Sequence, residues 1–168
     1  MAFDAFLKID GIPGEALDDK HKDWIEVLGY NYGATQATSA TASSAGGASS
    51  ERVNLSDFTV RKFVDKASAK LFEACCKGQH LKQVVLNVNR AGGDKVTYYQ
   101  ITLEEVVVSS INHTGAANDA ESGDLPTEVV TFNFARIKTT YTQQKRADGA
   151  GGGNVAGGWD RSMNKVYS

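Results

Sequence analysis

The chain has 168 residues, 41% of them hydrophobic and 23% charged, and its formal net charge at pH 7 is -2. This composition argues against a disordered chain, and no stretch approaches the roughly 20 apolar residues of a membrane-spanning helix. Because basic and acidic residues nearly balance, the chain lacks the excess positive charge that binding to nucleic acid or anionic lipid requires. We therefore expect one domain over residues 1–168, without nucleic acid as a partner and without membrane insertion.

Residues 2–10 alternate in the period of a half-buried strand, with Phe3, Ala5, Leu7 and Ile9 on one side. Asp4 and Lys8 stand where a signal peptide would carry its apolar run. We therefore expect the protein to be made in the cytoplasm, with no signal peptide and no export by the general secretory route.

A turn over residues 11–14 leads to a second expected strand over residues 24–36, which is long and rich in aromatic residues. The next segment, residues 37–50, contains only Ala, Ser, Thr and Gly. It has too little apolar bulk to pack a core, so we expect a small-residue extended loop or arm.

Residues 52–64 alternate again and predict a third strand, which the one convincing helix follows. The helix is expected over about residues 69–77, with Ser68 as its N-cap and Gly78 as the left-handed residue after its end. Leu71, Phe72 and Cys75 fall at one-face spacing, which predicts that they form the buried face.

Residues 83–90 and 95–103 flank Ala-Gly-Gly-Asp and predict a hairpin, the second strand of which continues through residues 106–111. A loop then leads to residues 128–143, the longest expected strand. The glycine-rich segment 145–158 precedes Trp159 and reads as a tail that crosses open space and then docks, with a final strand as one possibility. Many strands joined by short turns favour a mainly β fold, an antiparallel barrel or two-sheet sandwich with one short helix.

No arrangement of reactive residues predicts catalysis. The three histidines lie far apart in sequence and are expected at the surface, and Cys75 and Cys76 are adjacent, so they cannot staple the fold. Glu104 and Glu105 should point to opposite faces of a strand and so cannot act as a catalytic pair without a bulge. We expect no enzymatic activity, no metal and no cofactor.

Several segments in order resemble one protein family. They are residues 3–15 (FDAFLKIDGIPGE), His21 with residues 24–28 (WIEVL), residues 65–78 around the expected helix, residues 90–93 (RAGG), residues 103–110 (LEEVVVSS), and residues 127–144, with Thr127-Glu128, Asn133-Phe134-Ala135, Tyr141 and Gln143-Gln144. This set resembles the Hcp family, the tube protein of bacterial type VI secretion systems, over nearly the whole chain.

The resemblance implies hexameric rings of β-barrel subunits that stack into a hollow tube similar to a bacteriophage tail tube. The implied partners are other copies of the chain, the spike and sheath proteins of the type VI machine, and effector proteins carried in the lumen. The implied route runs from the cytoplasm through that machine to the extracellular medium or a target cell.

Two sets of residues are candidates for these contacts. If Trp24, Tyr30 and Tyr32 pack in the barrel, Asn31 faces the other way and is a candidate for the lumen wall and effector contact, although an exposed outer position fits the pattern equally well. The candidates for ring stacking lie in the small-residue loop: Ala42, Ser43, Ser44, Gly46 and Gly47. The alternative function is a monomeric β-barrel that binds a small ligand inside.

Overall fold

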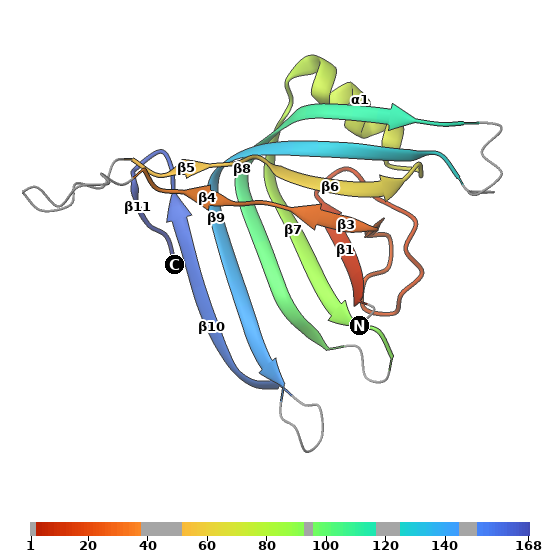
Figure 1. The fold of residues 1–168 in the computed structure, drawn as a ribbon. Helices are drawn as coiled ribbons and strands as arrows, with labels where there is room; N and C mark the ends of the chain where they lie inside the picture. Colours follow the sequence, from red (N-terminus) through yellow and green to blue (C-terminus); the bar gives the residue numbers. More distant parts are fainter. Residues whose placement is uncertain (1–2, 38–51, 93–95, 117–124, 145–150) are drawn as a thin grey trace, which may run out of the picture.

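A computed structural model describes residues 3–37, 52–92, 96–116, 125–144 and 151–168 (Figure 1). Strands make up most of these residues, with one short helix, as the alternating β-branched and aromatic sequence predicts. The elements are β1 (Phe3–Ile9), β2 (Ile25–Val27), β3 (Gly29–Asn31), β4 (Ala34–Thr35), β5 (Asn54–Leu55), β6 (Phe58–Phe63), α1 (Ser68–Lys77), β7 (His80–Arg90), β8 (Thr97–Thr114), β9 (Thr127–Gln144), β10 (Gly151–Asp160) and β11 (Lys165–Val166).

Antiparallel pairing joins nine of the strands into one sheet that curls into a barrel. The main path runs β11-β10-β9-β8-β7-β1-β2, and β6 links β9 to β3. Only Leu28 separates β2 from β3, and its backbone N–H donates to the carbonyl of Arg61 on β6 at 2.8 Å. The chain therefore passes directly from the strand beside β1 to the strand beside β6, and this passage closes the barrel.

The two longest strands, β8 and β9, belong to both halves of the sheet. The first part of β9 pairs with β6 and its later part pairs with β10. The buried positions change phase between Leu103 and Val106 on β8 and between Phe134 and Ile137 on β9. Glu105, at this bend, has a φ of 53°, which is the local irregularity that lets both strands change direction together.

One hydrophobic core fills the barrel. Tyr30 and Tyr32 lie over the ring of Phe58, with centroid distances of 6.3 and 5.9 Å, and the phenol oxygens of Tyr32 and Tyr99 are hydrogen-bonded. The largest fully buried apolar side chains come from strands around the barrel and from α1: Leu7, Ile25, Phe58, Leu71, Leu86, Ile101, Leu103 and Phe132. These large apolar side chains thus pack in the interior of the barrel.

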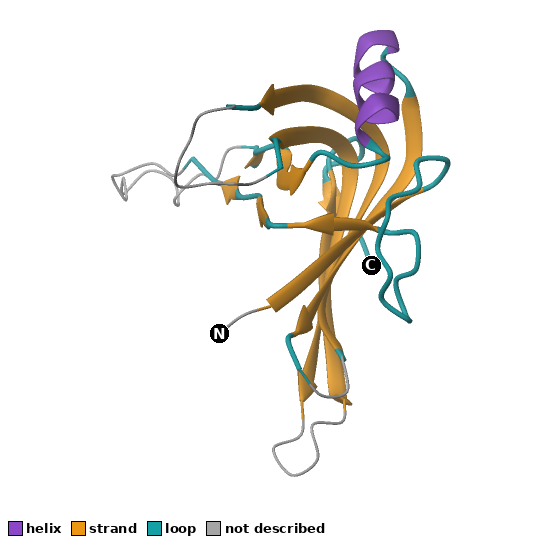
Figure 2. Ribbon diagram, turned by 90° about the vertical axis from the view of Figure 1, so that its right-hand side faces the viewer, coloured by secondary structure: helices purple, strands orange, loops and turns teal. Residues whose placement is uncertain are grey.

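The helix packs on β8 at one end of the barrel, opposite the end where the hairpins of β7–β8 and β9–β10 turn (Figures 1 and 2). Its start is held by the fully buried ammonium of Lys62, which lies 2.9 Å from an oxygen of Asp65 and 2.5 Å from an oxygen of the buried Glu128. Ser68 Oγ donates to the same Glu128 oxygen. A buried ion pair therefore joins β6, β9 and the helix.

The prediction for the helix is wrong in two details and right at its end. Ala67 is the N-cap residue and Ser68 begins the helix, because the Asp65 carboxylate accepts the Ala67 N–H at 2.9 Å while Ser68 Oγ is engaged with Glu128. Phe72 is 60% exposed, and Leu71 with Ala74 forms the buried stripe. Gly78, with φ 61°, ends the helix as predicted.

The two long strands predicted in the first half are each divided. Residues 24–36 form β2, β3 and β4, with breaks at Leu28 and at Tyr32 and Gly33, and residues 52–64 form β5 and β6 with a break at Ser56. The inward-facing positions change phase at Leu28 and at Ser56: Ile25 and Val27 precede Tyr30 and Tyr32, and Leu55 precedes Phe58. The sequence carries apolar residues in both phases, so its pattern does not mark the breaks. The small pair of β4 and β5 stands apart from the main sheet.

The second half follows the prediction more closely. The hairpin of β7 and β8 and the continuous strand through residues 106–111 are confirmed, and β9 spans the expected segment. The glycine-rich segment differs: β10 already begins at Gly151 and pairs with β9, so these glycines form a strand. The surface position predicted for His21 is also wrong. Its ring is buried between Phe6, with the ring centroids 4.5 Å apart, and Trp24.

Candidate assembly surfaces

The sheet ends on opposite sides of the molecule. Its main path begins at β11 and β10 and finishes at β1 and β2, and Figure 1 places β10 and β11 on the left and β1 and β3 on the right. Among the described residues, β11 pairs with the outer edge of β10 only at Trp159 and Asp160, and Tyr167 donates its N–H to the carbonyl of Gly158. The preceding residues of β10 thus present an open strand edge, a feature that monomeric proteins usually cover.

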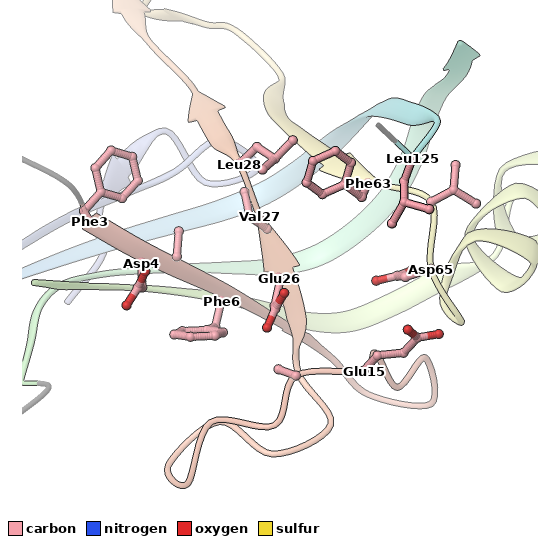
Figure 3. Close-up of a pocket in the computed structure, with 13 residues that line it drawn as sticks. Phe3, Asp4, Phe6, Glu15, Glu26, Val27, Leu28, Phe63, Asp65 and Leu125 are labelled. Carbon is pink, nitrogen blue, oxygen red and sulfur yellow. The ribbon is translucent and has the colours of Figure 1, made fainter. Parts of the chain in front are cut away.

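A hollow of about 410 Å³ lies at the other end, between β1, β2 and the segment after β6 (Figure 3). Large apolar side chains stand exposed around it: Phe3 (42%), Leu28 (40%), Phe63 (38%) and Leu125 (66%). Four carboxylates line the same hollow: Asp4, Glu15, Glu26 and Asp65. We call it the acidic hollow.

The four carboxylates differ in how they are held. Glu15 accepts the backbone N–H of Lys66 at 2.8 Å, and Asp65 is bound to Lys62 and to Ala67. Asp4 and Glu26 have no ion-pair or hydrogen-bond partner within the part of the chain that the structure describes. Their charges are therefore available for a partner that approaches the hollow.

The opposite side carries an exposed apolar and basic strip. Val155 on β10 is 72% exposed and Val166 on β11 is 71% exposed, while Lys165 beside Val166 is also exposed. We call these three residues, with the open edge of β10, the basic edge. Val155 lies on the open part of β10, and Val166 lies on β11 opposite Trp159, on the same face of the sheet. Exposed apolar side chains beside an open strand edge indicate an interface.

A polar cluster fixes β11 in place. Glu104 accepts a hydrogen bond from the phenol of Tyr167 at 2.7 Å and another from Nε of Arg136 at 2.8 Å. The Tyr167 phenol is the main cause of a lowered pKa of Glu104, and Arg136 acts in the same direction. Glu105 also lies 3.7 Å from Arg136, because its positive φ turns it back toward the Glu104 side. The basic edge is thus a rigidly anchored element.

The outward face of β3, β6 and β9 carries polar side chains and an exposed cation, Arg61. Asn31, Thr59 and Thr131 are register partners in one row across these strands, and the hydroxyls of the two threonines are 3.4 Å apart. Asp57 accepts hydrogen bonds from Ser109 and from Asn133, both at 2.9 Å. Many polar groups of this face are therefore satisfied by one another, and the row of Asn31, Thr59 and Thr131 is neutral beside the Arg61 guanidinium.

The structure places only one of the predicted site residues. Asn31 is exposed, while Tyr30 and Tyr32 pack on the core, as alternation predicts; its lumen role stays a prediction. The stacking candidates Ala42 to Gly47 lie outside the described residues. Sequence reasoning missed Glu26 and Lys165, whose importance depends on which strands form the two ends of the sheet. No local motif marks those positions.

The described residues contain no group of three or more His, Cys, Asp or Glu that could hold a metal ion. Among the same residues, no helix is long and apolar enough to cross a membrane. The barrel interior is filled by the core side chains, so the space that a small ligand would need is already occupied. This packing disfavours the ligand-binding alternative.

Comparison with known proteins gives one consistent result. The family described as "Type VI secretion system effector, Hcp" matches residues 6–141. The chain is 40% identical over 166 residues to the protein hcp1 of Pseudomonas aeruginosa, covering 98% of both. A solved structure of a type six secretion system protein matches with a TM-score of 0.91 and 34% identity, covering 99% of this chain and 100% of that one. Hcp1 from Salmonella typhimurium matches with a TM-score of 0.81 and 32% identity over the same shares.

Proposed function

Because the chain belongs to the Hcp family of type VI secretion proteins, we propose that it is a structural subunit of a hollow tube built from stacked hexameric rings. The observation that supports this most directly is the position of the two sheet ends. They lie on opposite sides of one subunit, and both expose apolar side chains. Subunits that join end to end would continue the sheet and close it into a ring.

In such a ring the outward face of β3, β6 and β9, which includes Arg61, forms the wall of the hole. The row of Asn31, Thr59 and Thr131 carries no charge, so it would hold a protein cargo only weakly and let it slide. The Asn31→Gln variant lengthens the side chain by one methylene at this wall. We expect it to reduce retention of a lumen-borne effector while rings still form; unchanged retention would remove Asn31 from the wall.

The remaining assignments follow from membership of a secretion machine. The small-residue segment with Ala42, Ser43, Ser44, Gly46 and Gly47 is proposed to contact the neighbouring ring, since small side chains permit close approach. The spike and sheath proteins are proposed as further partners, and effectors as cargo. The subunit is made in the cytoplasm and leaves through the type VI machine, and no catalytic step is part of this role.

The oligomeric state tests the proposal. Size exclusion coupled to light scattering, run on the full chain from low to high micromolar concentration, should give a mass near six times the 18.0 kDa of one subunit. A mass of one subunit at every concentration would contradict the tube role and return the ligand-binding barrel to consideration. In that case, small apolar compounds should raise the melting temperature.

A further inference from the structure

We propose that the acidic hollow of one subunit receives the basic edge of the next, with Glu26 and Asp4 facing Lys165. This pairing rests on the proposed ring and names the two surfaces that build it. The hollow lies beside β1 and β2, and the basic edge consists of Val155, Lys165, Val166 and the open edge of β10.

The apolar side chains supply the first argument. The hollow exposes Phe3, Leu28, Phe63 and Leu125 together, which is more than isolated surface residues would account for (Figure 3). Val155 and Val166 project from the other end of the same sheet. Burying an aliphatic side chain of this edge in the hollow of about 410 Å³ removes apolar surface from water on both subunits.

Charge supplies the second argument. Asp4 and Glu26 line the hollow, and Lys165 is exposed on the basic edge; within the described residues none of these three has an ion-pair or hydrogen-bond partner. Figure 3 shows the carboxylates of Asp4 and Glu26 on the same side of β1 and β2. Contact between the two surfaces brings opposite charges together, whereas contact between two hollows would bring carboxylates together.

Position supplies the third argument. The two surfaces terminate the same sheet path at opposite ends, so one copy can present its basic edge to a second copy while its own hollow takes the edge of a third. Such a head-to-tail contact generates a closed ring when the rotation between copies closes. A symmetric dimer, in which each surface meets its own copy, does not use this complementarity.

Charge reversal tests the pairing. Glu26→Lys and Lys165→Glu are made singly and together in the full chain, with Glu73→Lys as a control; Glu73 is half-exposed on α1, away from both surfaces. Each single reversal should weaken ring formation by about tenfold or more in subunit concentration, because an attractive contact becomes repulsive. The control should assemble as the wild type does. Circular dichroism and melting temperature verify that each monomer is folded.

Recovery is the decisive readout. The double variant, and equally an equimolar mixture of the two single variants, should regain assembly, since each restores opposite charges at contacts between subunits. The losses should shrink in high salt, because exposed charges are screened. Folded single variants that assemble as the wild type does, or a folded double variant as defective as the singles, would overturn the pairing while leaving the ring intact. A wild type that never assembles would overturn the proposed function and the pairing with it.

Discussion

The buried ion pair of Lys62 and Glu128 gives a quantitative prediction about stability. Lys62 is fully buried and Glu128 is 2% exposed, so water cannot solvate either charge when its partner is removed. In Lys62→Met, the Glu128 carboxylate keeps only the Ser68 hydroxyl as a donor among its described contacts. Removing one partner of a buried pair typically costs 3–5 kcal/mol in unfolding free energy.

The double variant Lys62→Met/Glu128→Leu replaces both charges by apolar side chains of similar length. Asp65, which also loses Lys62, is 13% exposed and keeps the Ala67 N–H as a donor. We expect its unfolding free energy to lie within about 1 kcal/mol of the wild type, because an apolar replacement avoids the desolvation penalty of both ions. For a chain of this size, each kcal/mol shifts the melting temperature by roughly 2–4 °C. The single variant should thus melt roughly 6–20 °C lower, and the double variant should recover most of that loss.

Urea unfolding, followed by circular dichroism at one fixed subunit concentration, measures these differences. Lys70→Met is the matched control, because it breaks the exposed pair of Lys70 and Glu73 on the helix and should cost no more than about 0.5 kcal/mol. A double variant as unstable as the sum of the two single variants would refute the reasoning. It would mean that the charges stabilise the fold beyond satisfying each other.

Three further predictions test other parts of the account. Glu104→Gln should lower the unfolding free energy by about 1 kcal/mol near pH 7, because the hydrogen bond from Tyr167 lowers the pKa of the Glu104 carboxyl below 4.5. The stabilisation by this carboxylate is present above the ordinary pKa and is lost as the pH falls through the lowered pKa. In acid unfolding titrations the difference between variant and wild type should therefore disappear. Gly158→Ala should cost roughly 1–3 kcal/mol and loosen β11, since its Cβ would lie 2.5 Å from the carbonyl oxygens of Ile137 and Tyr167; an unchanged melting temperature would contradict that packing. Leu71→Ala should cost about 2–5 kcal/mol, and Phe72→Ala much less, and equal losses in urea unfolding would place both side chains in the core.

The sequence predicts the strands of the second half well because their patterns are long. In β9, alternation holds over most of 18 residues, and β8 runs as one strand through residues 106–111, with a register shift between Val108 and Ser110. In the first half, the breaks at Leu28 and Ser56 follow from barrel closure and from the crossing to β4 and β5. Those are long-range constraints, and apolar residues stand in both phases around the breaks, so the local pattern does not locate them.

Two local errors have the same origin. Ser68 is a good N-cap by residue type, but the buried Glu128, sixty residues away, engages its hydroxyl, and Asp65 caps the first turn instead. His21 lies in a polar segment, yet Phe6 and Asn87 from distant strands enclose it. In both cases a tertiary contact decides what a side chain does, and the neighbouring residues in sequence carry no sign of it.

The candidate site shows the same limit. Asn31 could be found because alternation against two tyrosines fixes the face on which it lies. The acidic hollow gathers residues from β1, β2, the end of β6 and the loop before β9, so its composition is visible only once the sheet has closed. The basic edge likewise depends on β10 being the outermost long strand, where the sequence suggests a glycine-rich tail.

The claim on which the account depends is that this chain tiles with copies of itself around a hole. Negative-stain electron microscopy of the purified full chain, with end-on views averaged, tests it most directly. The account predicts annular particles with sixfold symmetry and an open centre, which Glu26→Lys abolishes and the double reversal restores. Fields of single compact particles at the same concentration for the wild type would contradict it.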